Sequence, residues 1–456
     1  MLNKFTLTDK AIGILGLGKT GISCFDYLLA HTTKIVCFDD NQRPRDEFAK
    51  CYGHSCLVDL DDARWKNLDY IVVSPGVSLY YPQKHRIYSL IGNAQIISDV
   101  EIFYAHRHNP AFQNINQTTN FIAVTGTNGK STICSLAAHI LQSLGYICGG
   151  NIGVPCLNLA QSSGYVLELS SFQLDLLTDF KPHVAAISNI TPDHIDRYPS
   201  MQQYIDSKLS IACNMNKNDY LVVNIDDPIL SSRLANLAHT NLITISSTSK
   251  ADIYWHNNTI IDNLNNKKLE FVSSKSLPGK HNIYNVLIAY AICLKSGMKS
   301  QEIIDKITTF VSLKHRLEYL GSVKNIDFYN DSKATNAASA RAAILSLENI
   351  FWLAGGISKE GGISDVLDLL PELRKAYFFG QSRFDFAKQA KDLVPVEICE
   401  LMQEAFLQAL NDAKCYNNKC SIVLSPACAS FDQFKDFIDR GEQFTELVNK
   451  FIVQQL

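Results

Sequence analysis

The chain has 456 residues, a length that corresponds to about three domains of ordinary size. Its apolar content of 46% and charged content of 19% are typical of a globular protein that buries large cores. The 42 basic and 45 acidic side chains leave a formal net charge of −3, so no overall positive field favours nucleic acid or an anionic membrane.

The sequence also argues against export and membrane insertion. The first ten residues lack the apolar core of a signal peptide, and no uncharged apolar run approaches the ~18 residues that span a bilayer. The 13 cysteines are an odd number, are scattered along the chain and form no C-x-x-C pair. We therefore expect free, buried thiols in a protein of the reducing cytoplasm.

Strands and helices alternate at the start of the chain. The expected strands cover residues 11–15, 34–38 and 70–73. Gly16, Gly18 and Gly21 lie in the turn between the first strand and a helix expected over residues 22–30, and Asp39 follows the second strand. This spacing is a dinucleotide-binding fingerprint, because the glycines allow a diphosphate to approach the N-terminus of the helix. On these residues alone, the segment is predicted to bind NAD.

Two boundaries divide the chain. Residues 109–120 are polar and poor in core residues, as expected of a linker. A second boundary is expected near residues 312–314, after an apolar helix. The predicted domains are therefore residues 1–108, 109–312 and 313–456.

A strand at residues 121–124 leads into a glycine-rich turn and then into an apolar helix that ends at Gly145. The turn consists of Gly126, Thr127, Asn128, Gly129, Lys130, Ser131 and Thr132. Its glycines can orient backbone N–H groups toward an anion, Lys130 adds a charge for the β- and γ-phosphates, and the Ser131 hydroxyl can hold Mg²⁺. A plain glycine turn is the alternative, but the Lys-Ser pair between a strand and a helix favours phosphate. The usual P-loop has a glycine where this chain has Val124.

Three residues beyond this loop could belong to a nucleotide site, and each also has a simpler interpretation. Glu168 lies in an apolar strand, where it could bind Mg²⁺ or face water from a sheet edge. His194 follows a strand at residues 184–188 and could be a ligand or an ordinary loop histidine. Lys208 lies on the apolar face of a helix, where it either extends its amine to solvent or is functional. A desolvated lysine has a lowered pKa, and its neutral amine could take up CO₂ to form a metal-binding carbamate.

The last segment alternates regularly between strands and helical patterns. The expected strands cover residues 326–329, 350–353, 376–379, 394–398 and 421–424. This alternation predicts an α/β fold with parallel sheets covered by helices on both faces.

Several motifs together resemble those of the Mur ligase family, ATP-dependent enzymes that build the peptide of the peptidoglycan precursor. The motifs are residues 126–131, 151–153, 168–174, 193–198, 279–282 with Asn285, 315–316, 330–336 and 425–434. The resemblance covers nearly the whole chain. The glycine-rich turn at residues 126–132 corresponds to the phosphate loop of this family, whose form lacks the first glycine of the usual P-loop. The resemblance implies a Rossmann-like N-terminal domain, a central P-loop ATPase-like domain with a parallel sheet, and a C-terminal Rossmann-like α/β domain.

The last two of these motifs, with the glycine turn near the start, most resemble the family member that adds D-glutamate. The resemblance implies that ATP phosphorylates the carboxylate of UDP-N-acetylmuramoyl-L-alanine and that the amine of D-glutamate attacks the resulting acyl phosphate. It also implies a cytoplasmic enzyme of cell-wall synthesis, and so of cell shape and division, which we expect to be a monomer.

The resemblance further implies two Mg²⁺ ions, one held by Ser131 and Glu168 and the other by His194 and a carbamylated Lys208. Lys130, His194 and Lys208 are the implied catalytic residues, and His194 would also orient the incoming amine. Charge neutralisation and in-line positioning are what phosphoryl transfer chiefly requires.

Four further residues are assigned to ATP by the resemblance: Asn282, Asn285, Arg316 and Asp331. The two asparagines lie at the start of an apolar helix, where capping is the alternative role. Asp331 ends a strand, where it could bind the ribose or cap a helix. Arg316 would reach the phosphates from the third domain when the domains close.

The resemblance reassigns the glycine turn of the first segment from NAD to the UDP-linked substrate, because a UDP-sugar also carries a diphosphate. The implied contacts are Gly16, Leu17, Gly18, Thr20, Asp39, Ser74, Pro75 and Gly76, with Asn151 at the muramoyl peptide. The chain departs from the family after Asp39, where Asp40 and Asn41 replace residues that often bracket uracil.

An acidic acceptor needs hydrogen-bond donors and positive charge. The residues that the resemblance assigns to D-glutamate are Lys333, Thr335, Lys359, Ser430, Phe431 and Phe437. Ser430 and Gln433 also have the spacing of a capping box, which predicts that a helix starts here and presents its N–H groups to a carboxylate. The chirality of the amino acid rests on the resemblance alone.

Three other functions are weighed against this one. A related ligase could add another amino acid or extend folate with glutamate, but the chain lacks the Asp-Asn-Pro-Arg signature of relatives that add diamino acids. A UDP-sugar- or dinucleotide-binding protein without catalysis would tolerate the loss of Lys130, Glu168, His194 or Lys208, and all four are present. A nicotinamide-dependent dehydrogenase would need a hydride-transfer site, and none is recognisable.

Overall fold

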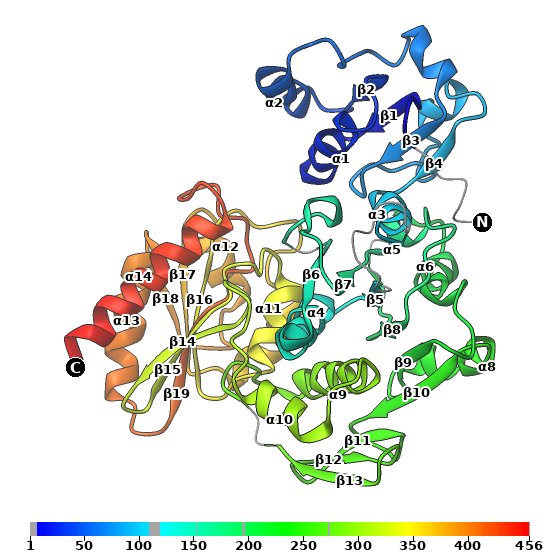
Figure 1. Cartoon of the computed structure of the whole chain (residues 1–456). Helices are drawn as coiled ribbons and strands as arrows, with labels where there is room; N and C mark the ends of the chain where they lie inside the picture. Colours follow the sequence, from blue (N-terminus) through cyan, green and yellow to red (C-terminus); the bar gives the residue numbers. More distant parts are fainter. Residues whose placement is uncertain (1–6, 109–118, 152, 194–196, 272–273, 456) are drawn as a thin grey trace. The chain divides into compact units, whose positions relative to one another are not determined.

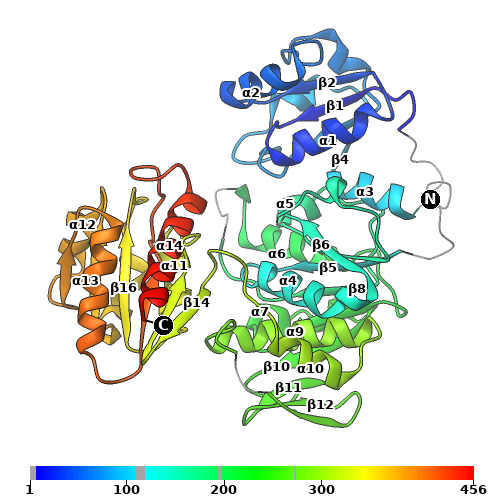
Figure 2. The same ribbon diagram turned by 60° about the vertical axis from the view of Figure 1, so that its left-hand side comes forward.

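The computed structural model describes residues 7–108, 119–151, 153–193, 197–271 and 274–455 (Figures 1 and 2). The chain forms two compact units: residues 1–271 with 284–307, and residues 272–283 with 308–456. The described residues contain three sheets, two in the first unit and one in the second. Most of the expected linker, residues 109–118, lies outside the described part of the chain.

The first sheet is fully parallel and has the order β2-β1-β3-β4. Its strands are β1 (Ile12–Leu15), β2 (Ile35–Phe38), β3 (Tyr70–Val73) and β4 (Gln95–Ile97), and the helices of this segment are α1 (Lys19–Leu29), α2 (Gln42–Tyr52) and α3 (Asp99–His108). The three strands expected from the sequence are all present. The short strand β4 was missed because its three residues are too few to give a periodic pattern.

The second sheet has nine strands in the order β13-β12-β11-β10-β9-β8-β5-β7-β6. Its strands are β5 (Asn120–Thr125), β6 (Tyr146–Gly150), β7 (Gly164–Glu168), β8 (Val184–Ile187), β9 (Tyr220–Asn224), β10 (Asn241–Ser246), β11 (Ile253–His256), β12 (Thr259–Asp262) and β13 (Lys267–Glu270). The helices of this segment are α4 (Lys130–Leu141), α5 (Ser171–Leu174), α6 (Met201–Leu209), α7 (Pro228–Ser231), α8 (Leu234–Leu237), α9 (Lys280–Lys295) and α10 (Ser300–Thr308).

The prediction of parallel sheets is wrong at one end of this sheet, because β11, β12 and β13 pair antiparallel. The turn between β11 and β12 consists of Asn257 and Asn258, whose φ angles are 46° and 57°. Two consecutive residues with positive φ form the tight turn that suits the twist of a hairpin, and asparagine tolerates this conformation.

The third sheet has the order β14-β15-β19-β16-β17-β18 and is parallel except for β14. Its strands are β14 (Glu318–Val323), β15 (Ile326–Asn330), β16 (Ile350–Gly355), β17 (Lys375–Phe379), β18 (Val396–Ile398) and β19 (Cys420–Leu424), and its helices are α11 (Ala337–Ile344), α12 (Arg383–Gln389), α13 (Met402–Cys415) and α14 (Phe437–Gln455). All five expected strands are present, and the antiparallel β14 is an addition.

Alternating strand residues of the third sheet form two separate cores. Phe328 packs with residues of α13 and α14, whereas its neighbour Tyr329 packs with residues of α11 and α12. Trp352 belongs to the second core and Leu353 to the first. The sheet is therefore covered by helices on both faces, as the strand–helix alternation predicts.

All 13 cysteines are free. Eight are buried, as expected, but Cys51, Cys213 and Cys415 are exposed. These three lie near or after helix ends, where an amphipathic pattern does not enforce burial. Within the described residues, no helix is both long and apolar enough to cross a membrane.

A buried hydrogen bond joins helix α9 to the antiparallel strands. The Tyr290 hydroxyl donates to Oδ2 of Asp262 at 2.8 Å, and both residues have an exposed fraction of 0%. Replacement of Tyr290 by Phe would leave the buried carboxylate with one donor fewer, at a cost of about 1–3 kcal/mol.

We therefore expect Tyr290→Phe to lower the free energy of unfolding by this amount in urea titrations. Tyr254→Phe is the matched control, because the Tyr254 hydroxyl has no hydrogen-bond partner among the described residues. Equal stability of the two variants would contradict the role of this bond.

Candidate active site

The glycine-rich turn after β5 has a backbone shape that two glycines impose. Gly126 has a φ of 140°, and a Cβ there would lie 1.9 Å from Oγ of Ser188. Gly129 has a φ of 85°, and a Cβ there would lie 2.3 Å from Oδ1 of Asn285. Both positions therefore accept only glycine, for reasons of backbone angle and of space.

Helix α4 begins at Lys130, directly after this turn. Its N-cap residue, Gly129, has no side chain to cap the first N–H groups, which a bound anion could satisfy. The Lys130 amine donates to the carbonyl oxygens of Gly126 at 2.9 Å and Thr127 at 2.7 Å. The turn thus combines a helix N-terminus with a positive charge held against the backbone.

Glu168 ends strand β7, which lies between β5 and β6 and is therefore not an edge strand. Its exposed fraction is 3%, so the interpretation of a water-facing edge residue is wrong. Ser131 Oγ donates to Glu168 Oε2 at 2.7 Å, and Asn151 Nδ2 donates to Oε1 at 2.8 Å. A buried carboxylate beside a serine hydroxyl next to a phosphate loop suits a hard cation such as Mg²⁺.

Lys208, on helix α6, is also buried, with an exposed fraction of 2%. Its amine donates to the Gly126 carbonyl oxygen at 2.8 Å and lies 4.6 Å from the ring centre of Tyr204. It therefore does not extend to solvent. Burial lowers the pKa of Lys208 from 10.5 to about 7, and the positive charge of Lys130 adds to the effect.

His194 lies outside the described residues, so the structure does not place its side chain. The segment before it lies against the glycine-rich turn: Asn189 Oδ1 accepts from the Asn128 N–H at 2.9 Å, and Thr191 N–H donates to Thr127 Oγ1 at 3.0 Å. The charge of Asp193 also acts on the pKa of Lys208. Among the residues that the structure describes, no group of three or more His, Cys, Asp and Glu is arranged to hold a metal ion.

The glycine turn at residues 16–21, which follows β1 in the first sheet, is held by hydrogen bonds to Asp39 and from Ser74. The Leu17 N–H donates to Asp39 Oδ2 at 2.7 Å, and Ser74 Oγ donates to the Gly16 carbonyl oxygen at 2.8 Å. A Cβ on Gly21 would lie 1.9 Å from that same oxygen, so helix and turn pack closely. Helix α1 has Gly18 as its N-cap and no side-chain cap, which leaves its first N–H groups able to bind a diphosphate.

The residues assigned to ATP lie on two parts of the chain. Asn285, in α9, has its Oδ1 beside Gly129 of the phosphate loop, and Asn282 Nδ2 donates to the Pro278 carbonyl oxygen at 2.6 Å. Asp331, which belongs to the second unit as Asn282 does, follows β15 and accepts from Ser425 Oγ at 2.7 Å. Burial raises the pKa of Asp331 to about 7, and nearby Arg316 opposes that rise.

Asp331 does not cap a helix. The N-cap of α11 is Asn336, whose side chain accepts from the Ser339 N–H at 2.8 Å. Asp331 Oδ1 instead accepts from the Leu317 N–H at 3.0 Å, which joins the segment of Arg316 to the end of β15.

Some of the residues assigned to D-glutamate come together near the end of β15. The Lys333 amine lies 4.7 Å from the ring centre of Phe437. Ser430 is buried, whereas Phe431 is 69% exposed. Thr335 is half-buried, and Lys359 is exposed in the segment after β16.

The capping box predicted at Ser430 and Gln433 is wrong. Residues 431–436 form turns and bends, and helix α14 begins only at Phe437. Gln433 Nε2 donates to the Glu400 carbonyl oxygen at 2.7 Å, so this side chain does not turn back to the backbone of Ser430. Asp436 performs the capping, since its Oδ1 accepts from the N–H groups of Ile438 and Asp439 at 2.8 and 2.9 Å.

Arg440 was not among the residues predicted from the sequence, and its exposed fraction is 0%. Its guanidinium donates to Ser332 Oγ at 3.0 Å, to the Ser332 carbonyl oxygen at 2.8 Å and to the Cys428 carbonyl oxygen at 3.0 Å. It therefore joins the segments after β15 and β19. Its position on the apolar stripe of α14, four residues before Phe444, is a signal that could have identified it.

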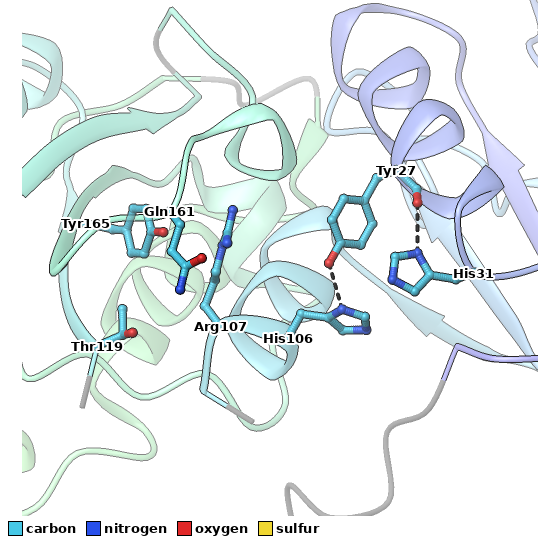
Figure 3. A pocket seen from close by; sticks show the side chains of 7 residues that line it. All are labelled: Tyr27, His31, His106, Arg107, Thr119, Gln161 and Tyr165. Atoms are coloured by element: carbon cyan, nitrogen blue, oxygen red, sulfur yellow. Dashed lines mark hydrogen bonds between the residues drawn. The ribbon is translucent and has the colours of Figure 1, made fainter. Parts of the chain in front are cut away.

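A separate pocket of about 100 Å³ lies in the first unit (Figure 3). Its lining residues are Tyr27, His31, His106, Arg107, Thr119, Gln161 and Tyr165, none of which belongs to the predicted site. The Tyr27 hydroxyl is 2.7 Å from His106 Nδ1, and burial lowers the pKa of His106 to about 4. Thr119 and Tyr165 lie near the starts of β5 and β7, at the opposite ends of those strands from the phosphate loop and Glu168.

Comparison with known proteins gives two family profiles. The profile of the Mur ligase MurD-like N-terminal domain matches residues 10–90, and that of the Mur ligase middle domain matches residues 124–293. The UDP-N-acetylmuramoylalanine–D-glutamate ligases of Rickettsia felis and Caulobacter vibrioides are 43% and 37% identical to the chain. These alignments cover 96% of this chain and 97% of the Rickettsia protein, and 97% and 96% for Caulobacter.

Solved structures with the same fold include two ligases from Thermotoga maritima. UDP-N-acetylmuramate-alanine ligase has a TM-score of 0.58 at 18% identity, and the match covers 97% of this chain and 99% of that chain. A MurF ligase in complex with ADP has a TM-score of 0.57 at 13% identity, covering 91% and 94%. At these identities the likeness is one of fold.

The lowered pKa of Lys208 gives a pH-dependent stability. Between pH about 7 and 10.5 the unfolded chain holds a proton on this amine that the folded chain has released. The free energy of unfolding of the wild-type protein should therefore rise with pH across this window. Below pH about 7, the folded chain carries a buried positive charge on Lys208 and bears the full cost of burying it. One pKa unit corresponds to about 1.4 kcal/mol.

In CO₂-depleted buffer, we expect Lys208→Met to unfold at higher urea concentration than wild type at pH 6, with the difference shrinking toward pH 10. The exposed Lys217→Met variant is the control. A Lys208→Met effect that does not vary with pH would contradict the lowered pKa.

Proposed function

The chain belongs to the Mur ligase family, and we propose that it joins D-glutamate to UDP-N-acetylmuramoyl-L-alanine at the expense of ATP. The observation that carries this proposal is the identity of 43% over 96% of the chain to a protein that bears this activity in its name. The phosphate loop, with its two obligatory glycines and Lys130, supplies the chemistry that such a ligase needs. Small-molecule substrates fit this assignment.

The reaction begins at the substrate carboxylate. One carboxylate oxygen attacks the γ-phosphorus of ATP, the bond to the β-phosphate oxygen breaks, and ADP leaves. The amine of D-glutamate then attacks the acyl phosphate carbon, and the tetrahedral intermediate expels phosphate as the amine loses a proton. Lys130 and the N-terminus of α4 would stabilise the negative charge on the transferring phosphoryl group.

We propose two Mg²⁺ sites, one at Ser131 and Glu168 and one at His194 and Lys208. Bound Mg²⁺ would neutralise charge and allow the carboxylate and the triphosphate to approach each other. The hydrogen bond of 2.7 Å between Ser131 and Glu168 supports the first site, because it holds two oxygen donors side by side in a buried place.

The lowered pKa of Lys208 supports the proposed carbamylation of its amine. At a pKa of about 7, much of the amine is neutral at physiological pH and can attack the carbon of CO₂, releasing a proton to solvent. The product carries a negative charge. The amines of Lys208 and Lys130 both donate to the Gly126 carbonyl oxygen, and as two cations they repel each other. A carbamate on Lys208 would instead attract the Lys130 ammonium.

We propose that Asn282, Asn285, Arg316 and Asp331 hold ATP and that D-glutamate binds among Lys333, Thr335, Lys359, Ser430, Phe431 and Phe437. The boundaries 1–108, 109–312 and 313–456 stay our proposal for the substrate, ATP and amino-acid domains. We also propose a cytoplasmic monomer.

Phosphate release in the presence of ATP, Mg²⁺ and UDP-N-acetylmuramoyl-L-alanine tests the function. We expect release with D-glutamate and none above background with L-glutamate, L-lysine or meso-diaminopimelate. Lys130→Ala should abolish release while it still binds the UDP-linked substrate, since Lys130 belongs to the phosphate loop and not to the glycine turn of the first sheet. Release with another acceptor would overturn the choice of amino acid, and release with none would overturn the ligase assignment.

The carbamate has its own test. We expect Lys208→Ala to lose about 10²-fold or more in kcat, and acetate or a similar short-chain carboxylate to restore part of it. Wild-type protein in ¹³C-bicarbonate should show a carbamate carbon signal that Lys208→Ala lacks and Lys217→Ala keeps. A wild-type spectrum without this signal, together with no rescue, would refute the carbamate.

A further inference from the structure

Arg197 lies directly after the segment that contains His194, and its guanidinium binds three consecutive backbone carbonyls of another part of the first unit. It donates to the carbonyl oxygens of Pro75 at 3.3 Å, Gly76 at 3.0 Å and Val77 at 2.9 Å. One charged fork thus holds a whole turn after β3, in a geometry that a lysine ammonium could not reproduce.

The guanidinium is also fixed from the side. It lies 4.1 Å from the ring centre of Phe172, and that ring stacks on Tyr198 at 5.8 Å and 10°. Phe172 belongs to α5, which begins three residues after Glu168 and is started by a capping box at Ser170. The orientation of Arg197 is therefore set by the same segment that supplies the buried carboxylate of the phosphoryl-transfer site.

Contacts lead from Arg197 to the predicted diphosphate site and to the helix that carries Lys208. On one side, Ser74 directly precedes the three residues whose carbonyls Arg197 contacts. Its hydroxyl donates to the Gly16 carbonyl oxygen in the glycine turn after β1. On the other side, the hydroxyl of Tyr198 donates to Asp175 at 2.7 Å and lies 3.2 Å from Oγ of Ser207, the residue before Lys208. Neighbouring residues 197 and 198 thus connect the diphosphate-binding turn to the helix that carries Lys208.

We propose that Arg197 is a positioning residue that fixes the turn at residues 75–77, and with it the UDP-linked substrate, relative to the phosphate loop. This inference rests on the proposed function. A substrate held by its diphosphate at the first sheet must place its distant carboxylate at the γ-phosphate, so a small error in the angle of the turn becomes a displacement at the reacting atom. Displacements of about 1 Å reduce rates by about 100-fold.

The test is steady-state kinetics of Arg197→Ala and Arg197→Lys with the UDP-linked substrate and ATP varied separately. We expect kcat to fall by about 10- to 100-fold and KM for the UDP-linked substrate to rise, while KM for ATP stays within about twofold. Arg197→Lys should resemble Arg197→Ala, because the three carbonyls are reached by two separate guanidinium nitrogens, and a single ammonium nitrogen lacks that span. Added guanidine hydrochloride at millimolar concentration should restore part of the activity of Arg197→Ala only.

Arg233→Ala is the control, because among the described residues the half-buried Arg233 guanidinium has one hydrogen bond, to Gln202 Oε1 at 2.9 Å. Unchanged kinetics of the Arg197 variants, or equal rises in both KM values without guanidine rescue, would overturn the positioning role. Wild-type protein without turnover would instead refute the proposed function, so the two failures are distinguishable.

Discussion

The carbonyl oxygen of Gly126 accepts hydrogen bonds from two lysine amines, Lys130 at 2.9 Å and Lys208 at 2.8 Å. Two like charges on one acceptor are unfavourable unless one of them is neutral or modified, or an anion lies close to both. The glycine is required because any side chain there would collide with Ser188. Around this point, the ends of β5 and β7 place the helix N-terminus and Glu168 together, and the phosphoryl transfer that we propose depends on this one arrangement.

The sequence predicts those parts of the fold that rest on local pattern. The strands of the third sheet are apolar runs whose alternate residues fill two cores, and this pattern is visible along the chain. The hairpin at Asn257 and Asn258 was missed because a polar pair between short strands also occurs in loops. The capping box at Ser430 failed because the spacing was right but Gln433 has a better partner in Glu400, a contact 33 residues away that no local rule can see.

The candidate site was found in the sequence mainly where a charged residue interrupts an apolar pattern. Glu168 in a strand and Lys208 on a helix are both such interruptions, and both side chains are buried. Arg440 interrupts the stripe of α14 in the same way and was missed, since a single arginine in a first turn is usually exposed. Arg197 carries no such signal, because its partners are backbone carbonyls that only the folded chain brings to it.

The proposed function depends on one step, in which the phosphate loop activates a carboxylate by phosphorylating it. The most direct measurement supplies UDP-N-acetylmuramoyl-L-alanine with ¹⁸O in both oxygens of its carboxylate and follows the label by mass spectrometry. If the carboxylate is phosphorylated, each turnover transfers one ¹⁸O to the released phosphate and leaves one in the new amide. Released phosphate without ¹⁸O, alongside amide formation, would contradict the acyl phosphate.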